Sequence, residues 1–227
     1  MQKTISIWPL AFLCFALPML AIHLAWFLSM SLELVPTCFP YLEGCTSISR
    51  SARHGISNHI FRMIMYPTAV IQIFVWLLSK KWLQKINVKQ NSGRLLPYIG
   101  FAAGIFLCLY ITFLGTEGDI YRLLRKYGIS LYYGLTYIAQ LILHYNLEPY
   151  KKYRLPKIML SLCLALLPMG LASLYFSATF VDPLKDIAEN IAEWNMTFLI
   201  MLWFLFLAMI WRQQGLGLEL KTTSSKN

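Results

Sequence analysis

"SIWPLAFLCFALPMLAIHLAWFLSM", residues 6–30, decides the fold. The stretch holds no Asp, Glu, Lys or Arg, and a helix needs roughly 20 mostly apolar residues to cross a bilayer. A cleaved secretory signal that starts at Lys3 is the alternative, but its apolar core usually has only about 7–15 residues. We therefore predict that this stretch is retained as a membrane span.

Five further apolar segments follow along the 227-residue chain. They are 61–79, 96–115, 128–147, 157–178 and 195–212. The chain is 58% hydrophobic and 13% charged, whereas a soluble domain carries about 25% charged residues. The sequence thus predicts an all-α fold, in which residues 1–227 form one polytopic transmembrane bundle of six spans. We expect a short disordered tail at 213–227.

The charges are divided unequally between the two sides of such a bundle. The termini and the loops 80–94 and 151–157 hold thirteen basic and two acidic residues, and the other connections hold seven basic and eight acidic residues. The positive-inside rule then places both termini in the cytoplasm. Orientation accounts for the net charge of +10, so no nucleic-acid partner is expected. The membrane is either a bacterial inner (plasma) membrane or a eukaryotic endomembrane or plasma membrane.

The first outer connection, "CFPYLEGCTSISRSARHG" at 38–55, is polar in an otherwise apolar chain. Cys38 and Cys45 are a candidate disulfide, because the outer side is oxidising; two reduced thiols are the alternative. The hydroxyls and arginines that follow them suit an anion, since a guanidinium offers forked donors to phosphate or carboxylate. Alternatively, this is a solvated loop whose arginines meet lipid phosphates without specificity.

The second outer connection, "GTEGDIYRLLRKYG" at 115–128, carries acids before bases. Thr116 and Asp119 have the spacing of a capping box, which predicts the start of a short helix. Arg122 is three residues from Asp119 and can pair with it. Either these charges only stabilise the helix, or Glu117 and Asp119 pair with an arginine of the first loop, Arg50 or Arg53, and shape one site.

The third outer connection, "VDPLKDIAENIAEWN" at 181–195, alternates apolar and charged residues with a helical period. It predicts an amphipathic helix that lies on the outer surface or over the bundle. Interfacial helices that seek anionic lipid are basic on the polar face, and this one is acidic. We therefore expect a lid or a scaffold.

The layout resembles that of the damage-regulated autophagy modulator (DRAM) and Sfk-type family. The resemblance rests on "PYLEGCTSIS" at 40–49, followed by "HIFR" at 59–62. It implies that Tyr41, Ser47, Ser49 and Phe61 occupy the family's motif positions. It also implies a role in a membrane-lipid, trafficking or GPI-lipid context.

The leading functional prediction is a protein that binds a lipid headgroup or a partner protein at its outer face without catalysis. The candidate ligand-binding residues are Tyr41, Glu43, Ser47, Ser49, Arg50, Arg53, His54, Glu117, Asp119 and Arg122. A second hypothesis is an enzyme acting on a phosphate-bearing or acylated lipid, with His54 as base and Arg50 and Arg53 holding an anion. A third is a small transporter. No metal or cofactor is expected, because the chain lacks zinc-ligand spacing and a glycine-rich phosphate loop.

Overall fold

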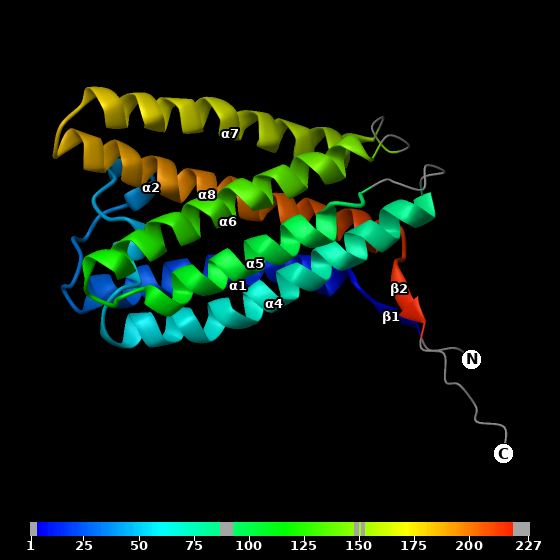
Figure 1. Cartoon of the computed structure of the whole chain (residues 1–227), viewed down its shortest axis with the longest axis horizontal. Coiled ribbons are helices and arrows are strands. Elements are labelled where there is room, and N and C mark those ends of the chain that lie inside the picture. Colours follow the sequence, from blue (N-terminus) through cyan, green and yellow to red (C-terminus); the bar gives the residue numbers. More distant parts are fainter. Residues whose placement is uncertain (1–3, 87–92, 148–149, 151–152, 220–227) are drawn as a thin grey trace, which may run out of the picture.

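The computed structural model describes residues 4–86, 93–147, 150 and 153–219. Its long helices lie side by side as a bundle (Figure 1). They are α1 (Trp8–Ser31), α4 (Gly55–Ile86), α5 (Leu96–Phe113), α6 (Asp119–Tyr145), α7 (Arg154–Thr179) and α8 (Leu184–Gln213). Two single-turn helices, α2 (Pro40–Glu43) and α3 (Ile48–Ser51), lie between α1 and α4. The predicted all-helical architecture is confirmed.

Five of the helices are long and apolar enough to cross a membrane: α1, α4, α5, α7 and α8. This composition is that of an integral, multi-pass membrane protein. Helix α6 covers most of the predicted span 128–147 but is not among the five. Charged residues occupy its first turns, and tyrosines, Gln140 and His144 make the rest of the helix less apolar. Its 27 residues correspond to about 40 Å at 1.5 Å per residue, and it runs along the bundle between α5 and α8 (Figure 1).

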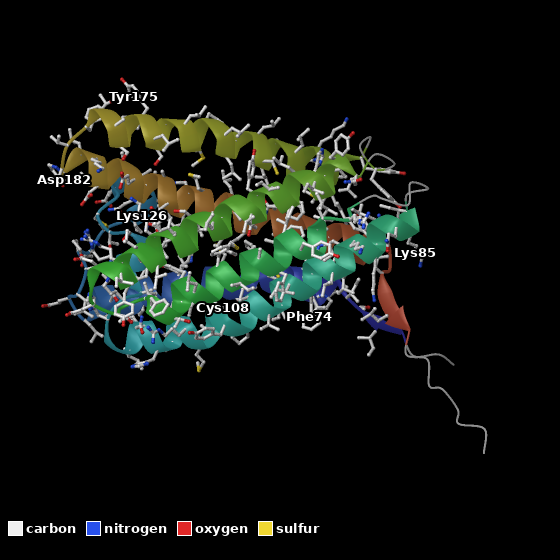
Figure 2. The ribbon with its side chains drawn as sticks, in the orientation of Figure 1. Phe74, Lys85, Cys108, Lys126, Tyr175 and Asp182 are labelled. Atoms are coloured by element: carbon white, nitrogen blue, oxygen red, sulfur yellow. A yellow bond between two sulfur atoms is a disulfide. The ribbon has the colours of Figure 1, made fainter. Side chains whose placement is uncertain are left out.

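The connections fall into two groups at opposite ends of the bundle (Figure 1). Helix α2, the α5–α6 connection and the α7–α8 connection share one end, here called the loop end. Both strands and the last turns of α4 and α6 lie at the other end, here called the terminal end. Figure 2 shows Lys126 and Asp182 at the loop end and Lys85 at the terminal end. The three connections that were predicted to share one side of the membrane therefore lie together.

The two ends of the described chain pair with each other. Strand β1 (Thr4–Ser6) is antiparallel to β2 (Gly217–Glu219), with Thr4 opposite Glu219. The expectation of a disordered tail from residue 213 is wrong for this strand, because its backbone groups find their partners in β1. Residues 220–227 lie outside the described residues.

Helix α8 lies at the centre of the bundle and contacts α1, α2, α3, α6 and α7. Its residues Trp194, Trp203 and Trp211 are fully buried. The prediction of a separate amphipathic helix on the outer surface is wrong, because those residues are the first turns of α8. Neither Gly nor Pro occurs between 184 and 213, so nothing interrupts the helix before the apolar segment begins.

Buried amides tie α6 to its neighbours. The amide of Gln72 on α4 donates to Thr136 at 3.2 Å and accepts from the Tyr132 hydroxyl at 3.0 Å. Gln140 donates to the carbonyl of Ile200 on α8 at 2.9 Å. Polar side chains in a bilayer usually form such interhelical bonds. These contacts make α6 an integral element of the bundle.

Candidate functional site

The connection between α1 and α4 is closed by a disulfide between Cys38 and Cys45, whose Cα atoms are 6.5 Å apart. Inside the closed loop, α2 begins with Pro40 at its first position and ends at Gly44, which is left-handed with φ of 61°. Glu43 accepts a hydrogen bond from the backbone amide of Phe39 at 2.7 Å. Glu43, a predicted ligand residue, thus satisfies the backbone amide of Phe39, the residue before α2.

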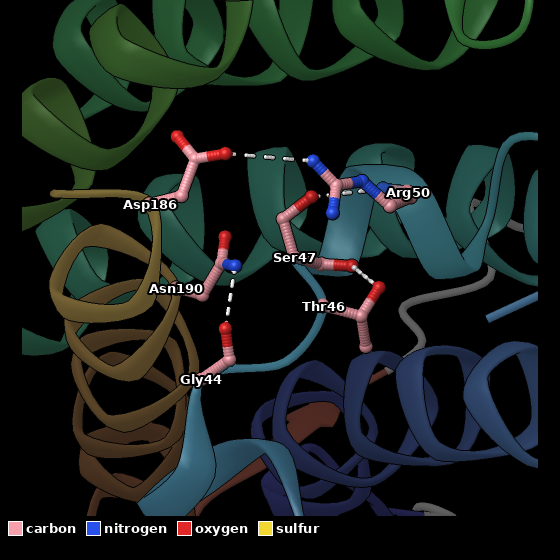
Figure 3. Close-up of polar contacts among 6 residues, drawn as sticks. All are labelled: Gly44, Thr46, Ser47, Arg50, Asp186 and Asn190. Carbon is pink, nitrogen blue, oxygen red and sulfur yellow. Dashed lines mark hydrogen bonds and ion pairs between the residues drawn. The ribbon is translucent and has the colours of Figure 1, made fainter. Parts of the chain in front are cut away.

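Helix α8 holds this loop by its backbone carbonyl groups. Asn190 donates to the carbonyl of Gly44 at 2.8 Å (Figure 3), and the Trp194 indole donates to the carbonyl of Thr46 at 2.9 Å. A Cβ atom added to Gly44 would lie 2.3 Å from the carbonyl oxygen of Ile187. The backbones of α2 and α8 therefore approach as closely as glycine allows.

Tyr41 connects the loop to α1 and α8. Its hydroxyl lies 3.1 Å from Nε2 of His23, and the two rings stack at 5.8 Å. His23 Nδ1 donates to the carbonyl of Met19 at 2.7 Å, so in the neutral imidazole Nε2 accepts the Tyr41 proton. Burial raises the pKa of Tyr41 to about 12, which keeps that proton in place. Asn195 also donates to the Tyr41 carbonyl, at 2.9 Å.

The serines of the loop orient α3. Ser47 accepts from the backbone amide of Arg50 at 3.0 Å as the N-cap of α3 (Figure 3). The hydroxyl of Ser49 lies 3.3 Å from that of Tyr110 on α5. From α8, the Glu193 carboxylate accepts the backbone amides of Ile48 and Ser49. Both predicted serines are thus engaged within the protein.

The predicted pairing of Arg50 or Arg53 with Glu117 or Asp119 is wrong. Arg50 pairs with Asp186 of α8 at 3.8 Å (Figure 3). Asp119 pairs with Arg122 at 3.1 Å, because three-residue spacing brings them together on α6. Glu117 is exposed in the connection before α6. Both ion pairs are substantially exposed, so each contributes roughly 0–1 kcal/mol.

The predicted capping box before α6 is also wrong. The N-cap is Gly118, with φ of 121°, and no side chain caps the helix. One basic residue of this segment, Arg125, instead binds the end of α5. Arg125 donates to the carbonyls of Phe113 and Thr116, next to the end of α5, where the helix dipole favours a cation.

Arg62 of α4 meets the same end of α5. It donates to the carbonyls of Thr112 at 3.0 Å and Leu114 at 2.5 Å. Asn58 reaches the Leu114 carbonyl as well, at 3.1 Å. Asn58 also donates to the carbonyl of Ala52 at 2.9 Å, and a Cβ atom added to Gly115 would lie 2.6 Å from the carbonyl oxygen of Arg53. The loop 38–55 and the α5–α6 connection therefore do meet. Sequence reasoning left out Arg62 and Arg125 because each sits within a helical segment.

Arg53 is half-buried, as Arg62 is, and within the described part of the chain the Nε of each is inaccessible and has no hydrogen-bond partner. Arg62 donates through a terminal nitrogen to the end of α5, whereas no side-chain hydrogen bond of Arg53 is found among the described residues. The charge of Arg53 repels that of Arg125 and acts on the Tyr110 hydroxyl. The two ion pairs found among the described residues include neither Arg53 nor Arg125. Two neighbouring guanidinium groups thus lack a carboxylate partner, with His54 exposed beside them.

Comparison with family models, with curated proteins and with solved structures finds no match for this chain. The resemblance to DRAM and Sfk-type proteins therefore stays a prediction. Among the residues that the structure describes, no three His, Cys, Asp or Glu side chains cluster in a way that could hold a metal ion.

Proposed function

We propose that the chain crosses the membrane six times, with both termini in the cytoplasm, and binds an anionic lipid headgroup at the loop end through Arg53 and Arg125. The pairing of β1 with β2 supports an even number of crossings, because the first and last spans must then meet the same side. Helix α6 supplies the sixth crossing. Its length of about 40 Å exceeds the roughly 30 Å of the hydrocarbon core.

The observation that carries the binding proposal is the unpartnered Nε of Arg53 beside Arg125. A buried donor without a partner costs about 1–3 kcal/mol, and two adjacent cations add repulsion. Because the Nε itself is inaccessible, a phosphate would accept from the terminal nitrogens. One phosphate shared by both guanidinium groups offsets their repulsion, because arginine matches phosphate with a fork of donors. An anion is therefore the ligand that this pair favours.

A lipid is the favoured source of that anion. Arg53 and Arg125 lie at the end of the bundle, and headgroups extend the bilayer from about 30 Å to about 40–45 Å. Lipid phosphates are therefore the anions at highest local concentration there. The disulfide, Tyr41, Ser47 and Ser49 act in this proposal as the scaffold that fixes the backbone before Arg53.

The catalytic alternative has less support. It assigned an anion to Arg50, which instead engages Asp186. The hydroxyls of Ser47 and Ser49 engage α3 and Tyr110, and His54 is exposed at the start of α4. The arrangement fits the binding of a lipid headgroup better than a catalysed reaction of that headgroup.

The test compares phosphatidylglycerol with phosphatidylcholine as ligands of the purified full chain, measured by native mass spectrometry. We expect Arg53→Ala to weaken phosphatidylglycerol binding by about tenfold, which corresponds to about 1.4 kcal/mol. Arg53→Lys should restore only part of the loss, because lysine has no fork. Arg122→Ala is the matched control, since Arg122 is exposed and already paired. Equal binding of both lipids, or equal loss in Arg53→Ala and Arg122→Ala, would contradict the proposal.

A further inference from the structure

An apolar groove of about 500 Å³ runs along the membrane-facing side of the bundle between α6, α7 and α8. Small-molecule sites have roughly 300–1,000 Å³. The groove exists because α7 stands apart from α6: in the most apolar stretch of α7 only 17% of the residues are buried. Figure 1 shows α7 as the outermost helix, alongside α8.

The glycines of the groove leave space empty. Elsewhere in the bundle, glycine permits close helix packing, since a Cβ at Gly128 would lie 3.1 Å from the backbone of α5. A Cβ at Gly134 would meet nothing within 4 Å, and one at Gly170 would meet only Met196 at 3.9 Å. Small residues in membrane helices usually mark helix contacts. Gly134 and Gly170 instead widen the groove.

The two tyrosine hydroxyls of the groove are engaged within the protein. The Tyr133 hydroxyl bonds to Thr197 at 2.6 Å, and the Tyr137 hydroxyl donates to the carbonyl of Cys163 at 3.1 Å. The remaining lining is mainly aliphatic, from Leu166 to Ile200. Ser130 and Ser173 are the other polar side chains of the lining. Because most of the wall is apolar, hydrocarbon suits it best.

A cation marks the loop-end side of the groove. Lys126 precedes Ser130 and Gly134 by four and eight residues, so these three positions share one face of α6. Lys126 is exposed and lies at the loop end (Figure 2). From Lys126 to Tyr137 the helix rises about 16 Å. A negative headgroup near Lys126 would therefore direct a hydrocarbon chain along the groove.

We propose that the groove between α6 and α7 holds one acyl chain of an anionic lipid, with its headgroup beside Lys126. The anionic character rests on the proposed function, and the acyl-chain site rests on the groove itself. The groove is built from spans that face the bilayer, where lipid chains surround the protein. Its loop-end charge is complementary to the headgroup.

The test uses the full chain in nanodiscs with phosphatidylglycerol that carries a photoreactive diazirine in one acyl chain. After irradiation, mass spectrometry maps the adducts. We expect them to concentrate on residues 130–137 and 166–174, rather than on the lipid-facing side of α4 at Val70 and Phe74. Gly134→Leu combined with Gly170→Leu should reduce the groove adducts about tenfold, because the added side chains occupy the space. Leu131→Phe is the control, since Leu131 is exposed on α6 outside the groove.

A thermal melt verifies that the double leucine variant is folded. Adducts spread evenly around the bundle would overturn the inference, and so would a cross-link between two copies of the chain through α6 and α7. Equal groove labelling by a phosphatidylcholine probe would keep the acyl-chain site and overturn its anionic selectivity. Absence of groove labelling while Arg53→Ala still weakens phosphatidylglycerol binding would overturn the groove and leave the proposed function standing.

Discussion

Asn190 donates to the carbonyl oxygen of Gly44 at 2.8 Å, across 146 residues of chain. Trp194, one turn later on α8, does the same for Thr46. The polar first turns of α8 therefore satisfy the carbonyl groups of a loop at the end of an apolar bundle. Unpaired, such buried carbonyl groups are costly. The polarity of α8 at this end is thus explained by the loop it holds.

Replacing Trp194 by Phe should destabilise the protein more than replacing Trp76 by Phe. Both indoles are fully buried, but the Trp76 indole nitrogen has no partner within the described residues, whereas that of Trp194 bonds to Thr46. We expect an extra loss of about 1–3 kcal/mol in Trp194→Phe, since the Thr46 carbonyl is left unsatisfied. Denaturation of the two variants in detergent measures the difference. Equal losses would show that the indole bond is not stabilising.

Gly44→Ala should be more damaging than Gly55→Ala. Both glycines have positive φ, so alanine costs about 1–2 kcal/mol at either position. At Gly44 the added Cβ also meets the Ile187 carbonyl at 2.3 Å, whereas at Gly55 it meets nothing within 4 Å. The comparison of the two melting temperatures therefore isolates the contact with α8. Equal shifts in melting temperature would mean that the loop moves away from α8 without a loss of stability.

Cys38 and Cys45 should be recovered as linked peptides by mass spectrometry of the nonreduced protein. Their Cα separation lies within the usual range for disulfides, about 4.4–6.8 Å. Both should resist alkylation until a reductant is added. Cys108, a half-buried free thiol, serves as the internal control for reagent access. Alkylation of Cys38 and Cys45 without reductant would contradict the closed loop.

Cysteine substitutions should report the topology in intact cells. A thiol at position 85 or 152 should be inaccessible to an impermeant reagent, because the basic residues place these connections in the cytoplasm. A thiol at position 50 or 120 should be labelled from outside. Labelling of position 85 from outside would show that the orientation is the reverse of the proposed one. Protection of position 120 alone would show that α6 does not cross the membrane.

The six apolar segments were predictable because each falls mostly on one long helix, and a long apolar composition is what a membrane helix requires. The helix boundaries were less predictable. Helix α8 begins eleven residues before its predicted span 195–212, because the polar turns are stabilised by contacts to the loop. The pairing of Thr4 with Glu219 involves backbone groups and leaves no pattern in the side chains.

The position of the candidate site was predictable, but its side-chain pairings were not. The loop 38–55 and the α5–α6 connection meet, as the shared charge pattern suggested. Which arginine remains without an acid depends on three-dimensional contacts. Arg50 finds Asp186 on α8, a pairing across 136 positions that sequence spacing does not encode. Glu193 was predicted only as part of a polar helix face, yet it binds the start of α3.

A double-mutant cycle on Arg53 and Arg125 tests the central claim most directly, because the claim is that one anion accepts from both side chains. Phosphatidylglycerol affinity is measured by native mass spectrometry for the wild type, Arg53→Ala, Arg125→Ala and the double variant. We expect a coupling free energy of about 0.5–3 kcal/mol, the range for residues that share a partner. Losses that add within about 0.3–0.5 kcal/mol would show that the two arginines do not hold the same anion.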